Sequence, residues 1–429
     1  MPFLGSLILV AAAATAIALI LRRLGLPGAR VVGGLVVGIA LGPTVLGRIA
    51  PEPWTRIMMG GTELREAVRQ TEREHAAWRF AAGAVPLSID DMELEAERHR
   101  LEVLPMKQAL RDAEDQHARP WVILTVLTAV GAAACGGMAG RPRRKVPLPD
   151  ADRPSERTGF ADAAAVGAWA AAIPVLGTIL TFTLLGYAAL DPTTLVAAAA
   201  VGIGAWTLDP IDLRLAGGRS AQTEMLRAGK VATLVAAGLI LVAASRGQTG
   251  WGVVGVVLLP IALSGTEFAR RWPVRQIRDL ILLPSLAALT VVRSELLLET
   301  PWLLTVLLIV LAGDGRWLGW FLGLIFSGLE PGGGSDAADA TDATAGKKTM
   351  NPMGATRAAS EYDTTPGGVL QTSLRRSLAA IDTAGPQLAV AGAGVALGLI
   401  GPGLAMSLAL AAAMLEITAP FRRRFARSL

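Results

Sequence analysis

Long apolar segments follow one another along almost the whole chain, and shorter polar segments separate them. Crossing a hydrocarbon core of about 30 Å takes about 20 helical residues, and several of these segments are long enough. The pattern predicts transmembrane helices at 3–21, 31–47, 120–139, 160–190, 192–207, 231–245, 251–266, 279–294, 301–329, 378–400 and 402–420. The predicted fold class is an all-α polytopic membrane protein with eleven transmembrane helices.

The second apolar segment reads "VVGGLVVGIALGPTVLG" (31–47) and spaces Gly34, Gly38 and Gly42 four residues apart. Small residues at this spacing share one helix face and allow two helices to approach closely in lipid. We therefore expect this face to pack against another helix. The Gly42-Pro43 pair is expected to end the helix.

A polar insertion, 48–119, separates the second and third spans. Within it, "TELREAVRQTEREHAAWRFAA" (62–82) places Leu64, Val68, Thr71, His75 and Trp78 at helical spacing, and Ser88 precedes Asp91 as in a capping box. We predict an extramembrane hairpin of two antiparallel helices joined near 83–86, with a kink at Pro105. Whether this hairpin docks an unknown protein partner is left open by the sequence.

A second polar region is rich in Gly, Ala, Asp and Thr and reads "PGGGSDAADATDATAGKKTMNPMGATRAASEYDTTPGG" (331–368). It has little to bury and is expected to be a disordered cytoplasmic linker. The predicted organisation is spans 1–2 (1–47), the insertion (48–119), spans 3–9 (120–329), the linker (330–377), and spans 10–11 with a basic tail (378–429).

Composition and charge support a membrane setting. The chain is 52% hydrophobic with a mean hydropathy of +0.48, which is too apolar for an ordinary soluble protein. With the N-terminus outside, the segments on the inner side hold 26 Lys and Arg, whereas the short outer loops hold only Arg246 and Arg293. Basic residues stay in the cytoplasm. We therefore expect a cytoplasmic C-terminus, and the net charge of +5 reflects orientation rather than nucleic-acid binding.

Few residues suggest catalysis or metal binding. The three histidines, His75, His99 and His117, are 24 and 18 residues apart, which matches no metal motif. Cys135 is the only cysteine, so no internal disulfide can form. No nucleophile–base pattern and no phosphate-binding glycine loop beside a strand is present. The sequence predicts no enzyme, no metal site and no cofactor.

Several motifs, in order, resemble the monovalent cation:proton antiporter-2 family, which includes potassium-efflux and sodium–proton exchangers. The most specific is "LRRLGLPGARVVGGLVVGIALGPTVLG" (21–47). Weaker matches are "GVVGVVLLPIALSGTEFARRW" (252–272), "LILLPSLAAL" (280–289), "GDGRWLGWFLGLIFSG" (313–328) and "GPQLAVAGAGVALGLIGPGLA" (385–405). The resemblance implies exchange of Na⁺ or K⁺ for H⁺, a homodimer, and an inverted-repeat bundle with two interrupted helices. We expect a bacterial inner (plasma) membrane protein.

The resemblance also indicates where the interruptions would lie. The candidates are "AWTLDP" (205–210), which contains Thr207 and Asp209, and "DTAGP" (382–386), which begins with Asp382. Unwound backbone and hydroxyl groups there could contact an ion, which is tolerable only around a cavity. The alternative is that both segments terminate helices at the membrane edge.

The carboxylate that the family uses for exchange is missing. In the family it lies in the span after the first interruption, here "GKVATLVAAGLILVAAS" (229–245), and no Asp or Glu occurs between Glu224 and Glu267. Ionisable residues at depth are costly and are functional suspects. Asp314 lies near the middle of 301–329, and Arg316 matches the position of the family's conserved Lys. A break at Gly-Asp-Gly could let these two side chains converge.

Two functions therefore remain from the sequence. One is a secondary transporter that uses a relocated acid such as Asp314 or Asp382. The other is a degenerate relative that has lost exchange and acts as a membrane scaffold or regulatory subunit. For Asp382, with Arg375 and Arg376 one or two turns away, an interfacial salt bridge is the expected role, and Glu416 is expected to be structural.

Overall fold

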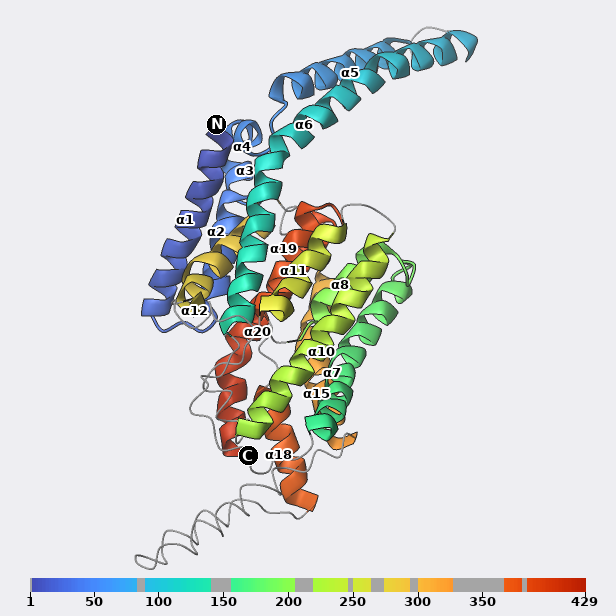
Figure 1. Ribbon diagram of the computed structural model, residues 1–429. Coiled ribbons are helices and arrows are strands. Elements are labelled where there is room, and N and C mark those ends of the chain that lie inside the picture. Colours follow the sequence, from blue (N-terminus) through green and yellow to red (C-terminus); the bar gives the residue numbers. More distant parts are fainter. Residues whose placement is uncertain are drawn as a thin grey trace, which may run out of the picture.

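The structure is a computed structural model of the full chain, and it consists of a helical bundle with a long helical arm (Figure 1). All regular elements within the described residues are helices. These residues are 2–82, 89–139, 156–204, 219–245, 250–263, 274–293, 300–326, 366–379 and 384–429. The expectation of an all-α protein is confirmed for this part of the chain.

Seven helices in the described residues are long and apolar enough to cross a membrane. They belong to α1 (Pro2–Arg23), α2 with α3 (Ala29–Leu41, Leu46–Ile49), α6 (Ile89–Ala139), α7 (Glu156–Leu184), α10 (Arg219–Ala244), the run α14–η4–α15 (Trp302–Val310, Leu311–Gly315, Arg316–Phe326) and α20 (Pro402–Ser428). The chain is therefore an α-helical membrane protein.

Four further predicted spans coincide with other helices. These are α8 (Pro192–Gly202), α11 (Gly250–Leu263), the continuous run α12–η2–α13 (Val274–Ile277, Arg278–Leu282, Leu283–Val291) and α19 (Ala384–Ala396). At 1.5 Å per residue, the described parts of α8, α11 and α19 are shorter than the hydrocarbon core. Within 301–329, the described residues form one helical run from Trp302 to Phe326, and Gly313 lies in its π-helical turn η4.

The glycine-spaced face of α2 packs directly on α13, as the spacing indicates. A Cβ atom at Gly34 would lie 2.1 Å from the carbonyl oxygen of Pro284, and one at Gly38 would lie 2.9 Å from that of Ala288. Only glycine leaves enough room for this approach of two backbones. Helix α2 ends at Leu41, immediately before Gly42-Pro43.

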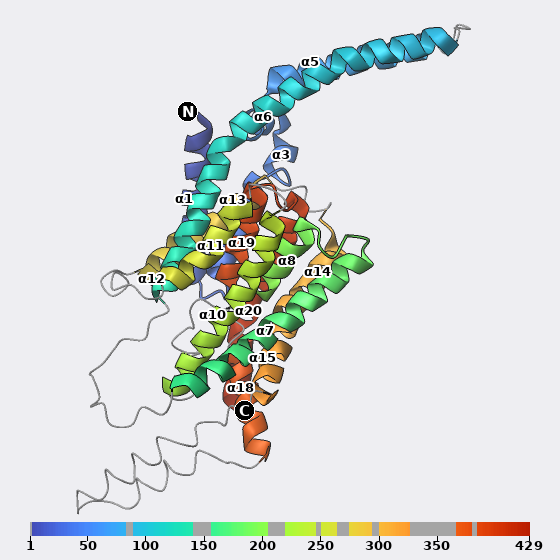
Figure 2. The same cartoon turned by 45° about the vertical axis from the view of Figure 1, so that its right-hand side comes forward.

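The arm is formed by α5 (Thr62–Ala82) and the first half of α6, which pack side by side (Figures 1 and 2). Val68 and Val103 are buried between the two helices, and the rings of His75 and His99 stack with 3.7 Å between their centroids. Helix α6 then continues into the bundle without a break. It contains Pro105 and Pro120 and curves between arm and bundle, since proline removes a helical hydrogen bond.

Short helices and ring contacts anchor the base of the arm. Helix α4 (Pro51–Met58) lies there, and His117 Nε2 is 2.8 Å from the carbonyl oxygen of Ile57. Trp121 Nε1 donates to the carbonyl of Leu289 at 2.8 Å, and the guanidinium of Arg293 lies 5.1 Å from the centroid of the Trp121 ring. The arm is thereby fixed to α13.

The expected linker is too long at its C-terminal end. Residues 366–377 belong to a helix, α18 (Pro366–Ala379), which packs against α15 and α20. Arg376 and Ser377 are buried there. Leu378 packs against the core of the bundle, whereas Leu370 stays exposed, so the end of this stretch makes an apolar contact that the preceding Gly- and Asp-rich sequence cannot make. The rest of the expected linker lies outside the described residues.

Candidate functional site

A short helix, α8, ends inside the bundle. Its N-terminus is capped by Asp191, whose carboxylate accepts from the backbone N–H of Thr193 at 3.0 Å, and its residues from Thr194 to Gly202 are all buried. Helices α7, α10, α19 and α20 surround it. The last carbonyls of a helix have no partner within the helix and carry a partial negative charge. Inside a membrane they need another donor.

The chain that leaves α8 is pressed against α10. A Cβ atom at Gly204 would lie 2.2 Å from the carbonyl oxygen of Gly229, so only glycine fits at this position. Ile203, between α8 and Gly204, has an extended backbone. The helix therefore stops at Gly202 within the packed interior and not at an exposed surface.

Arg316 provides the missing donors. It is the first residue of α15, and only 2% of its surface is exposed. Its Nε donates to the carbonyl of Val201, and its Nη2 donates to that of Ala200 at 2.9 Å. The guanidinium thus binds two of the last carbonyls of α8, where a positive charge is stabilised by the helix dipole.

Gln387 connects this contact to two more helices. Its Oε1 accepts from Arg316 Nη2 at 3.2 Å, and its Nε2 donates to the carbonyl of Leu408 in α20 at 2.9 Å. Gln387 is fully buried in α19, one turn after Ala384. On α14, Thr305 also reaches α20 through a 2.8 Å hydrogen bond with Ser407. The junction of α8, α15, α19 and α20 is called the Arg316 junction below.

The Arg316 junction contains a cation without a carboxylate among the residues described. The ion pairs formed by the described side chains do not include Arg316, and its Nη1 is buried without a hydrogen-bond partner. Placing a charged side chain at mid-membrane costs about 2.5–3.5 kcal/mol on insertion scales. The carbonyl groups of α8 and the Gln387 amide offset this cost.

Asp314 does not join the Arg316 junction. It lies in η4 and is exposed, whereas Arg316, two residues later, is buried. Two residues apart on a helix point to nearly opposite sides, and the π-helical turn does not unwind enough to change this. The predicted convergence of the two side chains is therefore absent from the structure.

The remaining predicted site residues fall outside the described part of the chain. Thr207 and Asp209 belong to 205–218, which follows α8, and Asp382 belongs to 380–383, which precedes α19. The described residues next to these segments are Gly204 and Ala384, and both are buried.

Helix α10 covers nearly all of the span 229–245, in which the sequence resemblance led us to expect a carboxylate. In the middle of this span, Leu234 and Val235 are half and one-third exposed. Thr233 is buried in α10, and its hydroxyl donates to the carbonyl of Gly229 at 2.8 Å. From residue 225 to the end of α10 the sequence contains no Asp or Glu.

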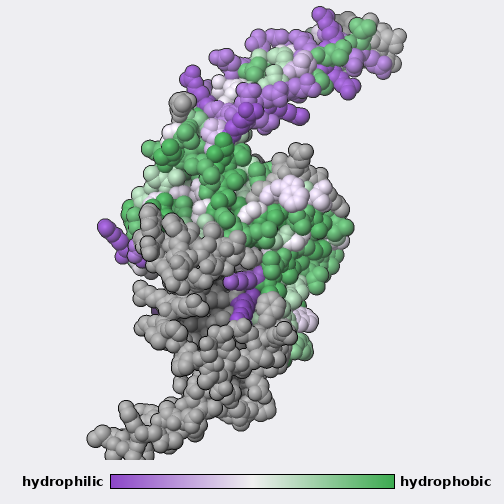
Figure 3. All heavy atoms as spheres, in the orientation of Figure 1, coloured by the Kyte–Doolittle hydropathy of each residue, from purple (hydrophilic) through white to green (hydrophobic). Residues whose placement is uncertain are grey.

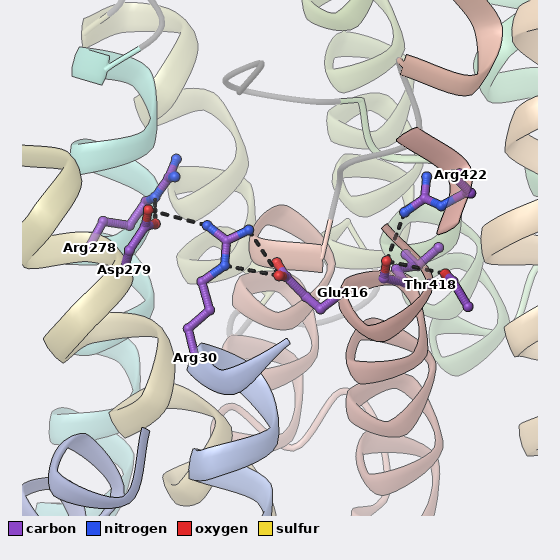
Figure 4. A network of polar contacts seen from close by, with 7 residues as sticks. Arg30, Arg278, Asp279, Glu416, Thr418 and Arg422 are labelled. Atoms are coloured by element: carbon purple, nitrogen blue, oxygen red, sulfur yellow. Dashed lines mark hydrogen bonds and ion pairs between the residues drawn. The ribbon is translucent and has the colours of Figure 1, made fainter. Parts of the chain in front are cut away.

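A second polar cluster, which the sequence did not reveal, joins α2, η2 and α20 (Figure 4). Arg30 donates through Nε and Nη2 to the Glu416 carboxylate, both at 2.9 Å, and lies 3.2 Å from Asp279. Asp279 also accepts from Arg278 Nε at 2.7 Å. Two cations thus face two carboxylates at the end of α2. Further along α20, Arg422 donates to the carbonyl of Leu415 at 2.7 Å.

The histidines of the arm form a stacked pair and not a metal centre. Within the described ranges no group of three or more His, Cys, Asp or Glu is placed to hold a metal ion. Burial in the seam lowers the pKa of His75, and the nearby His99 and Arg79 lower it further. The neutral imidazole is therefore favoured, which suits a ring that stacks on another histidine.

The fold and the Arg316 junction together define an α-helical membrane protein with a helix that ends in its interior. No protein-family model matches the chain, and no curated protein matches it.

Proposed function

We propose that this chain is a secondary transporter of the cation/proton antiporter type, which exchanges Na⁺ or K⁺ for H⁺. The observation that carries the proposal is the Arg316 junction, where a helix ends inside the bundle and its carbonyls face a buried cation. Helix ends and unwound backbone at membrane depth are found where they line a cavity or an ion pathway. The antiporter motifs in the sequence point to the same class of protein.

The proposal includes a finer topology. The seven long helices and the four shorter helical runs make up eleven crossings of the bilayer, with the N-terminus outside and the C-terminus in the cytoplasm. Helices α8 and α19 each form one part of an interrupted helix, and an inverted repeat relates the two interrupted helices. Support comes from Arg316, which binds a carbonyl at the end of α8 and also binds the side chain of Gln387, in the first turn of α19. A homodimer in a bacterial inner membrane is part of the proposal.

Asp382 is the carboxylate that we assign to exchange. Asp314 is exposed on the far side of its helix. Asp382 precedes α19, whose first residue is fully buried and whose Gln387 binds Arg316. In this scheme the carboxylate releases its proton when a cation binds and takes up a proton when the cation leaves. Arg316 stays bound to α8 and sets the local charge.

The test uses the full-length protein in proteoliposomes that contain a pH-sensitive dye. Imposing a Na⁺ or K⁺ gradient should change the internal pH, and Asp382→Asn should abolish the change. Asp314→Asn, a matched loss of one carboxylate at an exposed position, should leave it intact. An Asp382→Asn signal equal to that of the unchanged protein would reject the assignment.

A second candidate is a membrane scaffold or regulatory subunit that has lost exchange. The observation in its favour is that the hydrogen bonds of Arg316 in the described residues go only to neutral groups. The arm would then serve as the docking element. Absence of a pH signal from the folded protein with Na⁺, K⁺ and Li⁺, at several pH values, would reject transport and favour this function.

A further inference from the structure

The arm has an apolar face that points away from its own hairpin. Leu94 and Leu101 are one heptad apart on α6, and 72% and 68% of their surfaces are exposed. Glu97 and Arg98 lie between them, and these residues with Glu93 line a shallow hollow. The side chains that pack on α5, among them Val103, lie on the opposite side of α6.

The arm as a whole is hydrophilic, unlike the bundle (Figure 3). Leucines this exposed on such an arm are not explained by lipid contact. Two leucines spaced seven residues apart on one helix are typical of a surface that packs on another helix. We call the surface formed by Leu94, Glu97, Arg98 and Leu101 the Leu94–Leu101 face.

The Leu94–Leu101 face is complementary to its own reverse, with each leucine opposite a leucine and each charge opposite the other sign. Its order is Leu, Glu, Arg, Leu at positions 94, 97, 98 and 101, with a centre between 97 and 98. If a second α6 lies antiparallel across this centre, Leu94 meets Leu101 of the second copy, and Glu97 meets Arg98 of the second copy. A surface that complements itself in this way fits a two-fold, isologous contact.

Charges beside the face agree with this register. An antiparallel partner brings Glu93 near Arg100 of the second copy on the same flank. In the single chain, Arg98 is 3.9 Å from Glu95 and Arg100 is 3.8 Å from Glu97, and three of these four side chains are at least 60% exposed. Exposed pairs of this kind are weak. They can therefore exchange for pairs between the two copies.

We propose that two copies of this chain associate through their arms by antiparallel pairing of the Leu94–Leu101 faces. The arm projects from the bundle and leans outward over its end, so the face lies clear of the bundle (Figures 1 and 2). Two chains in one membrane can bring their arms together around an axis along the membrane normal. This contact does not depend on whether the bundle transports an ion.

Cross-linking of the full-length protein in membranes tests the position of the contact. In a Cys135→Ala background, Glu97→Cys places a thiol next to its counterpart in the second copy. Arg73→Cys is the control, because Arg73 is exposed on α5 and does not belong to the Leu94–Leu101 face. Cross-linked dimer should form through residue 97 and not through residue 73. Equal yields, or none at 97, would overturn the proposal.

Charge reversal tests the pairing itself. Glu97→Arg or Arg98→Glu alone places like charges opposite each other in both halves of the contact, and should weaken dimerisation about tenfold. The double reversal restores opposite charges and should recover the dimer. Fluorescence transfer between copies labelled at residue 73 in liposomes measures this. A double reversal that stays monomeric while it elutes as folded protein would overturn the proposal, and would point instead to a different partner for the arm.

Discussion

Replacing Arg316 with leucine tests whether the Arg316 junction holds the bundle together. The substitution removes the donors for the carbonyls of Ala200 and Val201 and for the Oε1 of Gln387. A buried acceptor left without a partner costs about 1–3 kcal/mol, so the three together cost roughly 6 kcal/mol. The same change removes a buried charge, and the loss of that charge stabilises the folded protein by about 3 kcal/mol. We expect Arg316→Leu to lower the free energy of unfolding by about 3 kcal/mol.

The assay is thermal unfolding of the purified full-length protein in detergent, followed by tryptophan fluorescence. Arg427→Leu is the matched control, because it removes one arginine from an exposed position near the end of α20. It should leave the unfolding temperature unchanged. Arg316→Lys keeps the positive charge and should fall between Arg316→Leu and the unchanged protein. If Arg316→Leu unfolded at the same temperature as Arg427→Leu, the carbonyls of α8 would not depend on Arg316, and the reasoning would fail.

Three further predictions concern other parts of the molecule. Gly34→Ala should destabilise the protein by about 1–3 kcal/mol, because its Cβ would meet the Pro284 carbonyl; an unchanged unfolding temperature would contradict the close packing of α2 on α13. Glu416→Leu should cost about 1–3 kcal/mol, since Arg30 loses two hydrogen bonds, whereas Glu416→Gln should cost less; equal losses would argue against the pair. Because the folded pKa of His75 is lowered, the arm is fully stable above the unfolded pKa of about 6.5 and loses stability as pH falls through the folded value. Hydrogen exchange in α5, corrected for intrinsic rates, should show this loss, and His75→Phe should remove it.

Two of these predictions have close controls. Gly5→Ala adds the same methyl group to a helix where a Cβ meets nothing within 4 Å, so it should be tolerated. His117→Phe changes a histidine at the base of the arm, outside the stacked pair, and should keep the pH dependence that His75→Phe removes.

Much of the architecture could be read from local patterns. The apolar segments correspond to helices because an apolar stretch must bury its backbone hydrogen bonds within itself in a membrane. The spacing of Gly34 and Gly38 indicated a close helix contact, and the repeat in 62–82 indicated the seam of the arm. The predicted C-terminal boundary of the linker was wrong because the weak apolar spacing of Leu374 and Leu378 adjoins a strongly polar stretch.

The Arg316 junction was only partly visible. Arg316 was recognisable as a charged residue in an apolar segment. Its partners, however, are backbone carbonyl groups 115 and 116 positions away, and because every residue has such a group, the sequence does not indicate which ones accept. Gln387 had a signal that could have been used, since a lone amide in an apolar span must find a partner. Asp314 stood out equally, yet the helix directs it outward.

By itself, the sequence determined the membrane setting, the helical class, the packing face of α2 and the absence of an acid from 225 to 266, because these depend on residue type and spacing along the chain. The tertiary structure decided which charges meet. Arg30 and Glu416 are 386 residues apart and form a pair, whereas Asp314 and Arg316 are two residues apart and do not. The reason is geometric: a helix turns neighbouring side chains to opposite sides, and only the packing of whole helices brings distant ones together.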